Sequence, residues 1–421
     1  GKESTISEIV KLVVEASNTK APIAKIADKV SSYFVPTVIV IAILAFIAYL
    51  ILGYDFASSL IVFVTILVVA CPCSLGLATP LAIVVAEGLC ANNGILVKKS
   101  EILENAQKIN TIVFDKTGIL TYGKLKISEI KNYTNMKNNE LLQLVGSLES
   151  KSTHPIGKAF TDYLEENKIT KVEVKDFENV SGHGIIGTVN NQKMIIGNSK
   201  ILEKYNIENN YKKDEEELSK NGNSIVYVTQ NNKIIALIGV NDIVRDNAKQ
   251  VIEELNENKI DTIMLTGDNK DTATKIAEDI GITKVIANVL PSEKTNVIKK
   301  LKSENKIVMM CGDGINDSPA LATADIGVSV KSGTDIAMDS SDVILTRDNL
   351  DSITKLISIS KKTIKIIKQN LFWAFFYNVL MIPIAIGFLK PFGISINPMI
   401  ASIAMVLSSL TVICNTLRLR R

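Results

Sequence analysis

Four long stretches of the chain contain no charged residue and are rich in apolar side chains. They cover residues 34–52, 56–86, 369–389 and 391–417. Each matches or exceeds the roughly 20 residues that a helix needs to cross a bilayer. The first is preceded by a basic amphipathic stretch without a small-residue cleavage site, so it differs from a secretory signal. The pattern therefore predicts an integral membrane protein with four spans.

The polar segment between the second and third predicted spans, about residues 98–368, is the larger part of the chain. An even number of spans places both termini on the side of the membrane that holds this segment. Lysine and arginine residues next to the spans gather on that side, which the positive-inside rule assigns to the cytosol. We therefore expect the polar segment and both termini to lie in the cytosol.

Within the polar segment, β-branched and apolar runs stop at acidic, glycine-rich turns and are followed by helix-like stretches. The runs are residues 111–114 before Asp115, 262–265 before Asp268 and 307–310 before Asp313. This alternation predicts a doubly wound α/β sheet, in which ligands bind at the carboxyl ends of the strands. Over residues 121–235, short alternating strands and Asn-, Lys- and Glu-rich turns replace it. They predict an α+β domain inserted into the first.

Composition and cysteine usage mainly exclude two classes of protein. The 47 basic and 44 acidic residues give a net charge of +3, which is too balanced for a protein that binds nucleic acid through a basic field. Five cysteines in a chain of 421 residues do not make a disulfide scaffold. Two of them, Cys71 and Cys73, lie inside the second predicted span and need another explanation.

A carboxylate directly follows the first predicted strand, in the sequence Asp115-Lys116-Thr117-Gly118. At the tip of a strand, Asp115 is placed to attack phosphorus and become an aspartyl phosphate. Taken alone, the tetrapeptide is also compatible with a simple strand-to-turn sequence, which is the less favoured alternative. Three later motifs favour the catalytic interpretation: Thr266-Gly267-Asp268-Asn269, Lys294 after Pro291-Ser292-Glu293, and Gly312-Asp313-Gly314-Ile315-Asn316-Asp317.

Phosphoryl transfer needs a nucleophile, a cation that spreads charge over the equatorial oxygens, and donors around them. Asp115 and Asp313 are expected to bind Mg²⁺, which prefers hard oxygen ligands. Lys294 and Thr266 are expected to contact the phosphate. The motifs thus predict an ordered phosphoryl-transfer site along the later part of the sheet.

The ordered motifs resemble those of the P-type ATPases, and Cys71-Pro72-Cys73 resembles the span of their heavy-metal branch. The resemblance covers essentially the whole chain. It implies a membrane α-helical bundle plus a cytosolic haloacid-dehalogenase-like, doubly wound α/β phosphorylation domain with an inserted α+β nucleotide-binding domain, using ATP and Mg²⁺. The implied catalytic residues are Asp115, Lys116, Thr117, Thr266, Gly267, Asp268, Lys294 and Asn316, and the implied Mg²⁺ ligands are Asp115, Thr117, Asp313 and Asp317.

The resemblance also divides the chain and assigns a nucleotide pocket. The expected parts are a linker over 1–33, two spans over 34–90, the phosphorylation domain over 91–120 and 236–350, the nucleotide-binding domain over 121–235, and two spans with a basic end over 351–421. The pocket residues implied are Glu149, His154, Gly182, Gly184, Gly197 and Asn198. Taken alone, His154 is more typical of an ordinary surface histidine. Residues 87–104 and 350–368 are expected to be helices that link the membrane to the cytosolic domains.

Cys71, Pro72 and Cys73 predict a metal site within the second span, because proline frees helix carbonyls and thiolates are soft ligands for Cu(I) or Zn(II). A proline kink with two small apolar side chains is the plainer alternative. The triplet alone does not choose the metal.

The last two predicted spans favour copper. Asn370, Tyr377, Asn378 and Pro383 in one, and Pro398, Met405, Ser408, Ser409 and Asn415 in the other, resemble the copper subgroup. The implied Cu(I) ligands are Cys71, Cys73, Tyr377, Asn378, Met405 and Ser409, although the polar ones are also typical of contacts between helices. The zinc subgroup is expected to carry an acidic residue in its last span, and residues 391–417 contain none.

Two departures from the family pattern change the expectation. Ile119 stands where the family usually has Thr, and we hypothesise that it slows phosphorylation, which the Ile119→Thr variant tests. The actuator domain and the first spans of the family are not found in the sequence, so we expect a truncated or partial pump whose phosphoenzyme forms but persists. The expected partners are the lipid bilayer, a cytosolic copper chaperone and the missing amino-terminal half, with no nucleic acid.

The sequence therefore predicts ATP-driven export of Cu(I) through an aspartyl phosphate. Three alternatives stay open. One is a Zn(II) or Cd(II) pump of the same family, and another is a catalytically silent membrane copper-binding protein. A phosphatase of the haloacid dehalogenase type shares the aspartate nucleophile but explains neither the inserted domain nor the spans.

Overall fold

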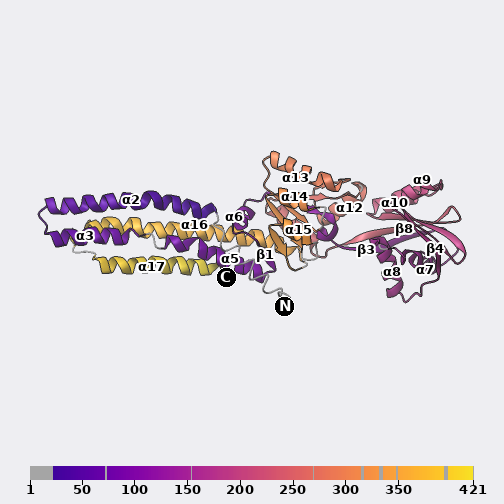
Figure 1. The fold of residues 1–421 in the computed structure, drawn as a ribbon, viewed down its shortest axis with the longest axis horizontal. Coiled ribbons are helices and arrows are strands. Elements are labelled where there is room, and N and C mark those ends of the chain that lie inside the picture. Colours follow the sequence, from indigo (N-terminus) through magenta and orange to yellow (C-terminus); the bar gives the residue numbers. More distant parts are fainter. Residues whose placement is uncertain are drawn as a thin grey trace. The chain divides into compact units, whose positions relative to one another are not determined.

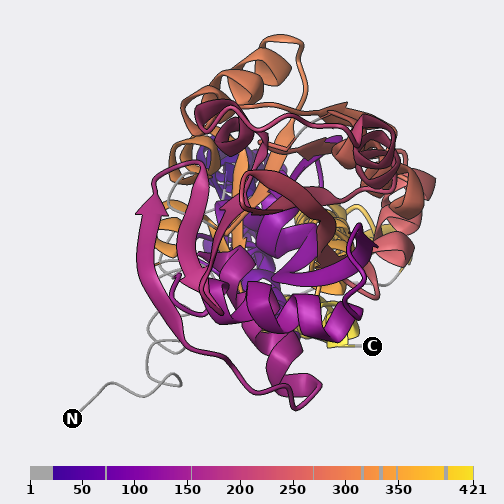
Figure 2. The same ribbon diagram turned by 90° about the vertical axis from the view of Figure 1, so that its right-hand side faces the viewer.

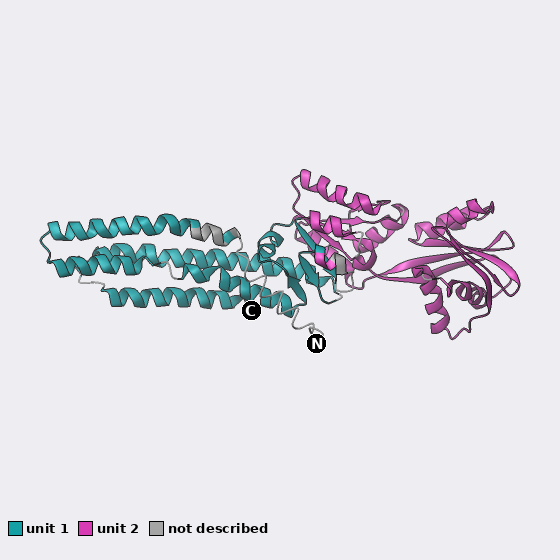
Figure 3. Cartoon of the chain, in the orientation of Figure 1, with its two compact units in different colours: residues 1–109, 325–331, 340–421 teal, residues 110–324, 332–339 magenta. Residues whose placement is uncertain are grey.

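The computed structural model describes residues 22–71, 74–152, 154–268, 270–313, 317–330, 335–347, 349–392 and 397–420. The chain forms two compact units (Figure 3). Unit 1 comprises residues 1–109, 325–331 and 340–421, and unit 2 comprises residues 110–324 and 332–339. Each unit has its own framework of helices and strands and its own buried apolar clusters.

Unit 1 is mainly helical (Figure 1). Its helices are α2 (Pro22–Ile51), α3 (Phe56–Val69), α4 (Leu75–Ala78), α5 (Pro80–Asn92), α6 (Glu101–Ala106), α16 (Asp351–Ile386) and α17 (Pro398–Leu417). Among the residues that the structure describes, four helical segments are long and apolar enough to cross a membrane: Lys29–Ile51, Leu75–Asn92, Asp351–Ile386 and Pro398–Arg420. Apolar side chains from α2, α3, α16 and α17, such as Val38, Ile66, Ile382 and Ala401, form one buried cluster. Three of these segments correspond to the first, third and fourth predicted spans, whereas Leu75–Asn92 overlaps only part of the second.

The second predicted span is not one helix, which corrects the expectation for residues 56–86. Helix α3 ends at Val69, and the helical chain resumes only with α4 and α5, which are separated at Thr79. Pro80 begins α5, as expected of a residue that lacks an amide hydrogen and is tolerated in the first turn of a helix. Pro72 and Cys73 lie outside the described residues. The break leaves Cys71 beyond the end of α3 instead of within a continuous span.

The expected linking helix over residues 87–104 is also wrong. Helix α5 ends at Asn92, and Gly94 follows with a φ of +76°, a conformation that favours glycine after a helix end. The chain then forms β1 (Ile95–Val97), which pairs antiparallel with β13 (Val343–Leu345), and β13 pairs parallel with β12 (Ile326–Val330). The expected helix over 350–368 is confirmed as the first half of α16.

The core of unit 2 contains a parallel sheet with the strand order β11-β2-β9-β10. The strands are β2 (Thr111–Asp115), β9 (Asp261–Leu265), β10 (Lys284–Ile286) and β11 (Val308–Gly312), and the helices are α11 (Ala248–Glu257), α12 (Lys270–Ile280), α13 (Lys294–Ser303) and α14 (Ser318–Thr323). Helix α15 (Asp335–Ser340) follows. Val113, Met310, Ile298 and Leu321 belong to one buried cluster between the sheet and α13 and α14. The predicted doubly wound α/β fold is confirmed.

An antiparallel sheet is inserted between β2 and β9, with the order β3-β8-β7-β6-β5-β4. Its strands are β3 (Thr121–Asn132), β4 (Val174–Val180), β5 (Gly184–Val189), β6 (Gln192–Gly197), β7 (Ser224–Gln230) and β8 (Lys233–Val244). The hairpins β5–β6 and β7–β8 turn at Asn190-Asn191 and Asn231-Asn232, all four with positive φ, as two-residue hairpin turns require.

Residues alternate between the two faces of this inserted sheet. Val226 and Ile238 pack with α7 (Asn138–Glu149) and α8 (Pro155–Glu166), whereas Tyr227 and Leu237 pack with α9 (Ser199–Lys204) and α10 (Lys212–Lys220). The helices accordingly lie on opposite faces of the sheet (Figures 1 and 2). The expected domain boundary at residue 235 falls inside β8, because this strand continues to pair with β3 as far as the register Val244 with Thr121.

Candidate functional site

Asp115, the last residue of β2, lies at the centre of a buried group of charges. Its side chain is 7% exposed. Lys294, the first residue of α13, donates a hydrogen bond from Nζ to Asp115 Oδ1 at 2.8 Å and another to Asp317 Oδ1 at 2.7 Å. One buried ammonium group therefore bridges the carboxylates that follow two neighbouring parallel strands.

Asp313 completes this cluster. Ligand atoms of Asp115, Asp313 and Asp317 all lie within 4.8 Å of one another. Burial and the neighbouring Asp317 raise the pKa of Asp115 to about 7, although Lys294 opposes the rise. Burial and Asp317 likewise raise the pKa of Asp313 to about 6. Three carboxylates that face one lysine form a donor set that fits a hard divalent cation such as Mg²⁺.

Gly118 permits the close approach of Asp313. Its φ is +76°, and a Cβ atom at this position would lie 1.7 Å from Asp313 Oδ2. Thr117, predicted as a further Mg²⁺ ligand, is exposed at the same turn. The sequence Asp115-Lys116-Thr117-Gly118 thus needs glycine both for its conformation and for the space that Asp313 occupies.

The second predicted catalytic motif is joined to the first by an ion pair. Lys116 Nζ, which is buried, pairs with the carboxylate of Asp268. The Asp268 amide donates to Thr266 Oγ1 at 3.1 Å, so the buried Thr266 shapes the turn that presents Asp268. Gly267 is exposed between them. Asn269 and the predicted catalytic Asn316 lie outside the described residues.

Arg245, Thr121 and Asp242 also belong to the site, although the sequence did not predict them. Arg245 is 4% exposed, and it donates from Nε to the Ile119 carbonyl at 2.6 Å and from Nη2 to the Gly118 carbonyl at 2.7 Å. Thr121 Oγ1 donates to Asp242 and contacts the Lys116 carbonyl. These residues fix the turn after Asp115 from the far end of β8. Asp242 and Arg245, two charged residues at the end of a mostly apolar run, were the sequence feature that could have indicated this role.

Arg245 binds the carbonyl of Ile119, and the side chain of Ile119 is 1% exposed. The hypothesis that this residue slows phosphorylation stays a prediction.

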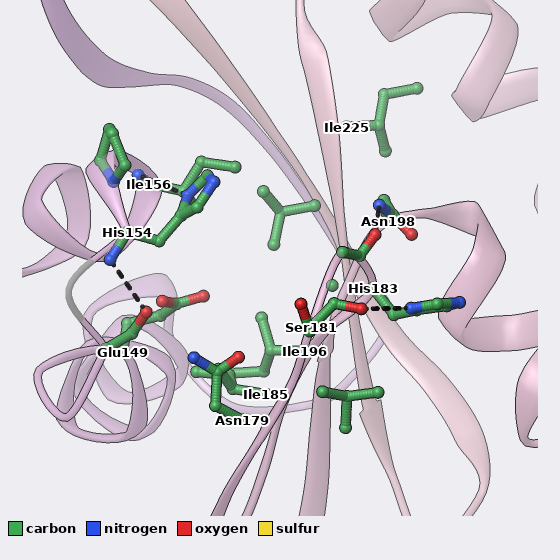
Figure 4. A pocket seen from close by; sticks show the side chains of 17 residues that line it. Glu149, His154, Ile156, Asn179, Ser181, His183, Ile185, Ile196, Asn198 and Ile225 are labelled. Carbon is green, nitrogen blue, oxygen red and sulfur yellow. Dashed lines mark hydrogen bonds between the residues drawn. The ribbon is translucent and has the colours of Figure 1, made fainter.

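All six predicted nucleotide-binding residues line one cavity of about 440 Å³ in the inserted domain. They are Glu149, His154, Gly182, Gly184, Gly197 and Asn198. Figure 4 shows Glu149 and His154 on the helical side of the cavity, opposite Ser181, His183 and Asn198 on the strand side. Apolar side chains such as Ile185 and Ile196 lie between the two sides. A cavity of this size and mixed lining suits a small organic ligand.

The polar residues of the cavity are fixed by local structure. His154 caps α8, where its Nδ1 accepts from the Ile156 amide at 3.3 Å. Asn198 caps α9, accepting from the Lys200 amide and donating to the Gly182 carbonyl at 3.0 Å. Glu149 is buried, and burial raises its pKa to about 7. The cavity therefore presents a carboxyl group that is partly protonated near neutral pH.

Gly184 and Gly197, two of the predicted pocket glycines, are needed for the packing of neighbouring strands. A Cβ at Gly184 would lie 2.1 Å from the Ile196 carbonyl oxygen, and one at Gly197 would lie 2.2 Å from the His183 carbonyl oxygen. The close approach of β5 and β6 therefore requires both glycines. Gly182, with a φ of +73° and no atom within 4 Å of an added Cβ, is the one that leaves space beside the cavity.

The predicted copper ligands come from three elements of unit 1. Cys71 is exposed beyond the end of α3, and Cys73 lies outside the described residues. On α16, Tyr377 is half-buried, and Asn378 is 4% exposed with no hydrogen-bond partner for its Nδ2 atom among the residues that the structure describes. On α17, Met405 and Ser409 are half-buried. Helices α4, α16 and α17 pack against one another, and the copper-ligand assignment stays a prediction.

Comparisons with known proteins agree over the whole chain. The haloacid dehalogenase-like hydrolase family matches residues 109–325. A copper-exporting P-type ATPase of Staphylococcus haemolyticus is 41% identical over 425 residues, which cover 100% of this chain and 52% of that protein. One of Legionella pneumophila is 41% identical over 426 residues, which cover 100% of this chain and 58% of that protein. The chain thus spans about half the length of these relatives.

Two solved structures of metal-transporting or CPx-type ATPases also match the chain. A zinc-transporting PIB-type ATPase in the E2.Pi state is 29% identical with a TM-score of 0.83, and the match covers 99% of this chain and 68% of that one. The catalytic domain of a CPx-ATPase is 30% identical with a TM-score of 0.53, and the match covers 63% of this chain and 96% of that one. The resemblance to heavy-metal P-type ATPases is confirmed.

Proposed function

Because the chain belongs to the haloacid dehalogenase-like hydrolase family, we propose that it is the catalytic and metal-binding part of a P-type ATPase that exports Cu(I). The observation that carries the proposal is the buried group in which Lys294 bridges Asp115 and Asp317 beside Asp313. This group lies at the carboxyl ends of parallel strands, where ligands of such sheets bind. The cavity of the inserted domain supplies the nucleotide site.

We propose that an Asp115 carboxylate oxygen attacks the γ-phosphorus of ATP. A new bond forms between this oxygen and phosphorus, the bond to the bridging oxygen breaks, and ADP leaves with the bonding electrons. Lys294 keeps positive charge beside the attacking oxygen, and its contact with Asp317 fixes its position. Mg²⁺, when bound by Asp115, Asp313 and Asp317, would neutralise the carboxylates and the phosphate oxygens.

Residues around the nucleophile hold it in place. Arg245 binds the carbonyls of Gly118 and Ile119, and the pair of Lys116 with Asp268 joins the two catalytic turns. These contacts restrain the turn that carries Asp115, so the attacking oxygen is positioned before the substrate arrives. Glu149, His154 and Asn198 are proposed to orient the nucleotide in the inserted domain.

Copper is the proposed cargo, with Cys71 and Cys73 as soft ligands and Tyr377, Asn378, Met405 and Ser409 completing the site. The copper-exporting relatives at 41% identity support this choice. Zn(II) or Cd(II) is the second candidate, because one similar solved structure is a zinc-transporting ATPase. The proposed location is a bacterial plasma membrane with the catalytic domains in the cytosol. A copper chaperone and the remainder of the pump are the proposed partners.

The proposal is tested by phosphate incorporation from γ-labelled ATP into the detergent-purified chain, with Cu(I), Zn(II) or no metal. Asp115→Asn, which keeps the size of the side chain but removes the nucleophile, is the control. Labelling that requires Asp115 and rises with Cu(I) alone supports the copper pump. Labelling that rises with Zn(II) alone replaces it by the second candidate. Absence of labelling together with normal Cu(I) binding favours a silent copper-binding protein.

A further inference from the structure

A buried amide network joins α16 and α17, which carry four of the proposed copper ligands, to α4, which begins four residues after Cys71. Asn370 on α16 is 0% exposed. Its Nδ2 donates to the carbonyl of Ala78 on α4 at 3.1 Å and to Thr416 Oγ1 on α17 at 2.8 Å. Its Oδ1 accepts from Asn415 Nδ2 at 2.9 Å. A single side chain of α16 therefore binds both α17 and the segment that follows the two proposed cysteine ligands.

The network continues to the end of α17. Asn415 Nδ2 also donates to Gln369 Oε1 at 3.2 Å, and Asn415 Oδ1 accepts from Arg418 Nη1 at 2.9 Å. Thr416 Oγ1 donates to the Val412 carbonyl, which leaves its lone pairs to Asn370. The buried amide atoms of Asn370 and Asn415 are all engaged. Such a fully satisfied polar group fixes one arrangement of the elements it joins.

A second polar contact joins the start of α4 to α17. Ser74, just before α4, shares a hydrogen bond of 3.0 Å with Ser408 on α17. Ser74 and Ala78 are four residues apart, and Ser408 and Asn415 are seven apart, so both contacts lie along one side of each helical stretch. Leu75, Ala78, Ala374 and Val412 pack together in an apolar cluster. The segment after Cys71 and Cys73 is thus held at two polar contacts with apolar packing beside them.

The spacing on α16 relates this network to the proposed ligands. Tyr377 and Asn378 follow Asn370 by seven and eight residues, which places them about two turns away on the same side of the helix. We infer that Asn370 is a positioning residue for the copper site: it sets the position of α4, which begins four residues after Cys71, relative to Tyr377, Asn378 and α17. The inference rests on the proposed function, because it assumes that these residues bind Cu(I).

The role differs from that of a ligand. The two donor hydrogens and the carbonyl oxygen of Asn370 are engaged with protein partners, so this side chain is not available to the metal. Its removal would leave the Ala78 carbonyl and the Asn415 amide without these partners in a buried place. A buried unsatisfied group costs enough to change an equilibrium by about tenfold or more. The segments are then expected to shift relative to one another, which alters the geometry offered to Cu(I).

The test measures Cu(I) affinity of the purified 421-residue chain by competition with a coloured Cu(I) chelator. Asn370→Leu keeps the approximate size of the side chain and removes all its hydrogen bonds, and we expect the dissociation constant to rise about tenfold or more. Thr416→Val leaves the Ala78 contact in place and is expected to have a smaller effect. Thr363→Val is the matched control, because Thr363 is equally buried on α16 but donates within its own helix, to Ile359.

Two further measurements separate positioning from general stability. The X-ray absorption spectrum of bound Cu(I) should change in Asn370→Leu, in the number or distance of its scatterers, and should not change in Thr363→Val. Asn370→Ser, whose shorter side chain does not reach Ala78, is a milder variant in case Asn370→Leu fails to fold. ATP binding by the inserted domain should stay at the wild-type level in both. The double variant Asn370→Leu with Asn415→Leu should lose little more Cu(I) affinity than the more affected of the two single variants, since both residues belong to one network.

The inference is overturned if Asn370→Leu or Asn370→Ser binds Cu(I) with wild-type affinity and spectrum, or if Thr363→Val loses as much affinity as they do. The Cys71→Ser variant tells this result apart from a failure of the proposed function. If the wild-type chain binds no Cu(I), or binds it equally without Cys71, the result contradicts the proposed copper site itself. The inference, which rests on that site, is then rejected as well.

Discussion

Two buried polar clusters in this molecule are built in opposite ways. In unit 2, Asp115, Asp313 and Asp317 face one another with Lys294 as the bridging cation, and burial raises the pKa of Asp115 and Asp313. In unit 1, Asn370 and Asn415 carry no charge, and their amide atoms are satisfied by protein partners. The first cluster has more carboxylates than ammonium groups, so it suits the binding of a cation together with a phosphate. The second is complete without a ligand and suits the fixing of one geometry.

The largest effect is expected from removing the cation of the charged cluster. Lys294→Met leaves the buried carboxylates of Asp115 and Asp317 without their ammonium partner, so it should lower the initial rate of phosphate incorporation by about 10²-fold or more. The measurement is a time course with γ-labelled ATP at fixed Mg²⁺. Lys300→Met, on the exposed side of the same helix, is the control and should keep the wild-type rate. Equal rates for all three proteins would show that the charge of Lys294 has no part in the reaction.

A smaller but still large effect is expected from crowding the same cluster. Gly118→Ala would place a Cβ 1.7 Å from Asp313 Oδ2 in a backbone conformation that L side chains rarely adopt. Asp313 must then move, so phosphorylation should need more Mg²⁺ and should slow by about tenfold or more. A Mg²⁺ titration of the labelling rate measures both changes. Gly88→Ala, where no atom lies within 4 Å of the added Cβ, serves for comparison. An unchanged Mg²⁺ requirement would contradict the role given to Asp313.

A pH-dependent effect on stability, not on the reaction rate, is expected from a third kind of buried polar group, the isolated carboxyl of Glu149. Burial raises its pKa from 4.5 to about 7. A raised folded-state pKa means that the stability of the folded protein is fully present below pH 4.5 and falls as pH rises to about 7. Glu149→Gln removes this loss, so it should stabilise the inserted domain above pH 7 by on the order of 3 kcal/mol and leave it unchanged near pH 4.5.

Hydrogen–deuterium exchange of the β7 and β8 amides measures this difference. The protection of Glu149→Gln should exceed that of the wild type at about pH 8 and match it at the lowest pH at which the chain remains folded, when both are compared at the same pH. Glu140→Gln, in the exposed first turn of the same helix, is the control. Equal protection at the higher pH would mean that Glu149 is ionised without cost in the folded protein.

Several features were predictable because they depend on periodicity and on chain direction. Apolar runs long enough for a bilayer gave the membrane segments, and strands that end at aspartates gave a parallel sheet with its carboxylates at one edge. Strand polarity then places Asp115 and Asp313 at the same edge of the sheet, and the pairing of β2 with β11 makes them neighbours. The six nucleotide-pocket residues were predicted from family resemblance, and the structure places them around one cavity.

Other features depended on which atoms become neighbours after folding. Residues 56–86 are uniformly apolar, and hydropathy does not distinguish one helix from α3, α4 and α5 in succession. The end of the inserted domain was set too early because the pairing of β8 with β3 extends to Val244. Arg245 was missed because its partners are backbone carbonyls, which no sequence pattern marks.

From the residue pattern we could predict three of the four membrane segments, the α/β core with its inserted domain, and the acidic residues at the strand ends. These follow from the spacing of apolar residues and from local backbone preferences. The tertiary structure alone decided that Lys294 bridges two carboxylates, that Lys116 pairs with Asp268, and that Asn370 joins α4 to α17. Most buried polar atoms pair wherever packing places a partner, and for these three side chains the partner lies far away in the sequence.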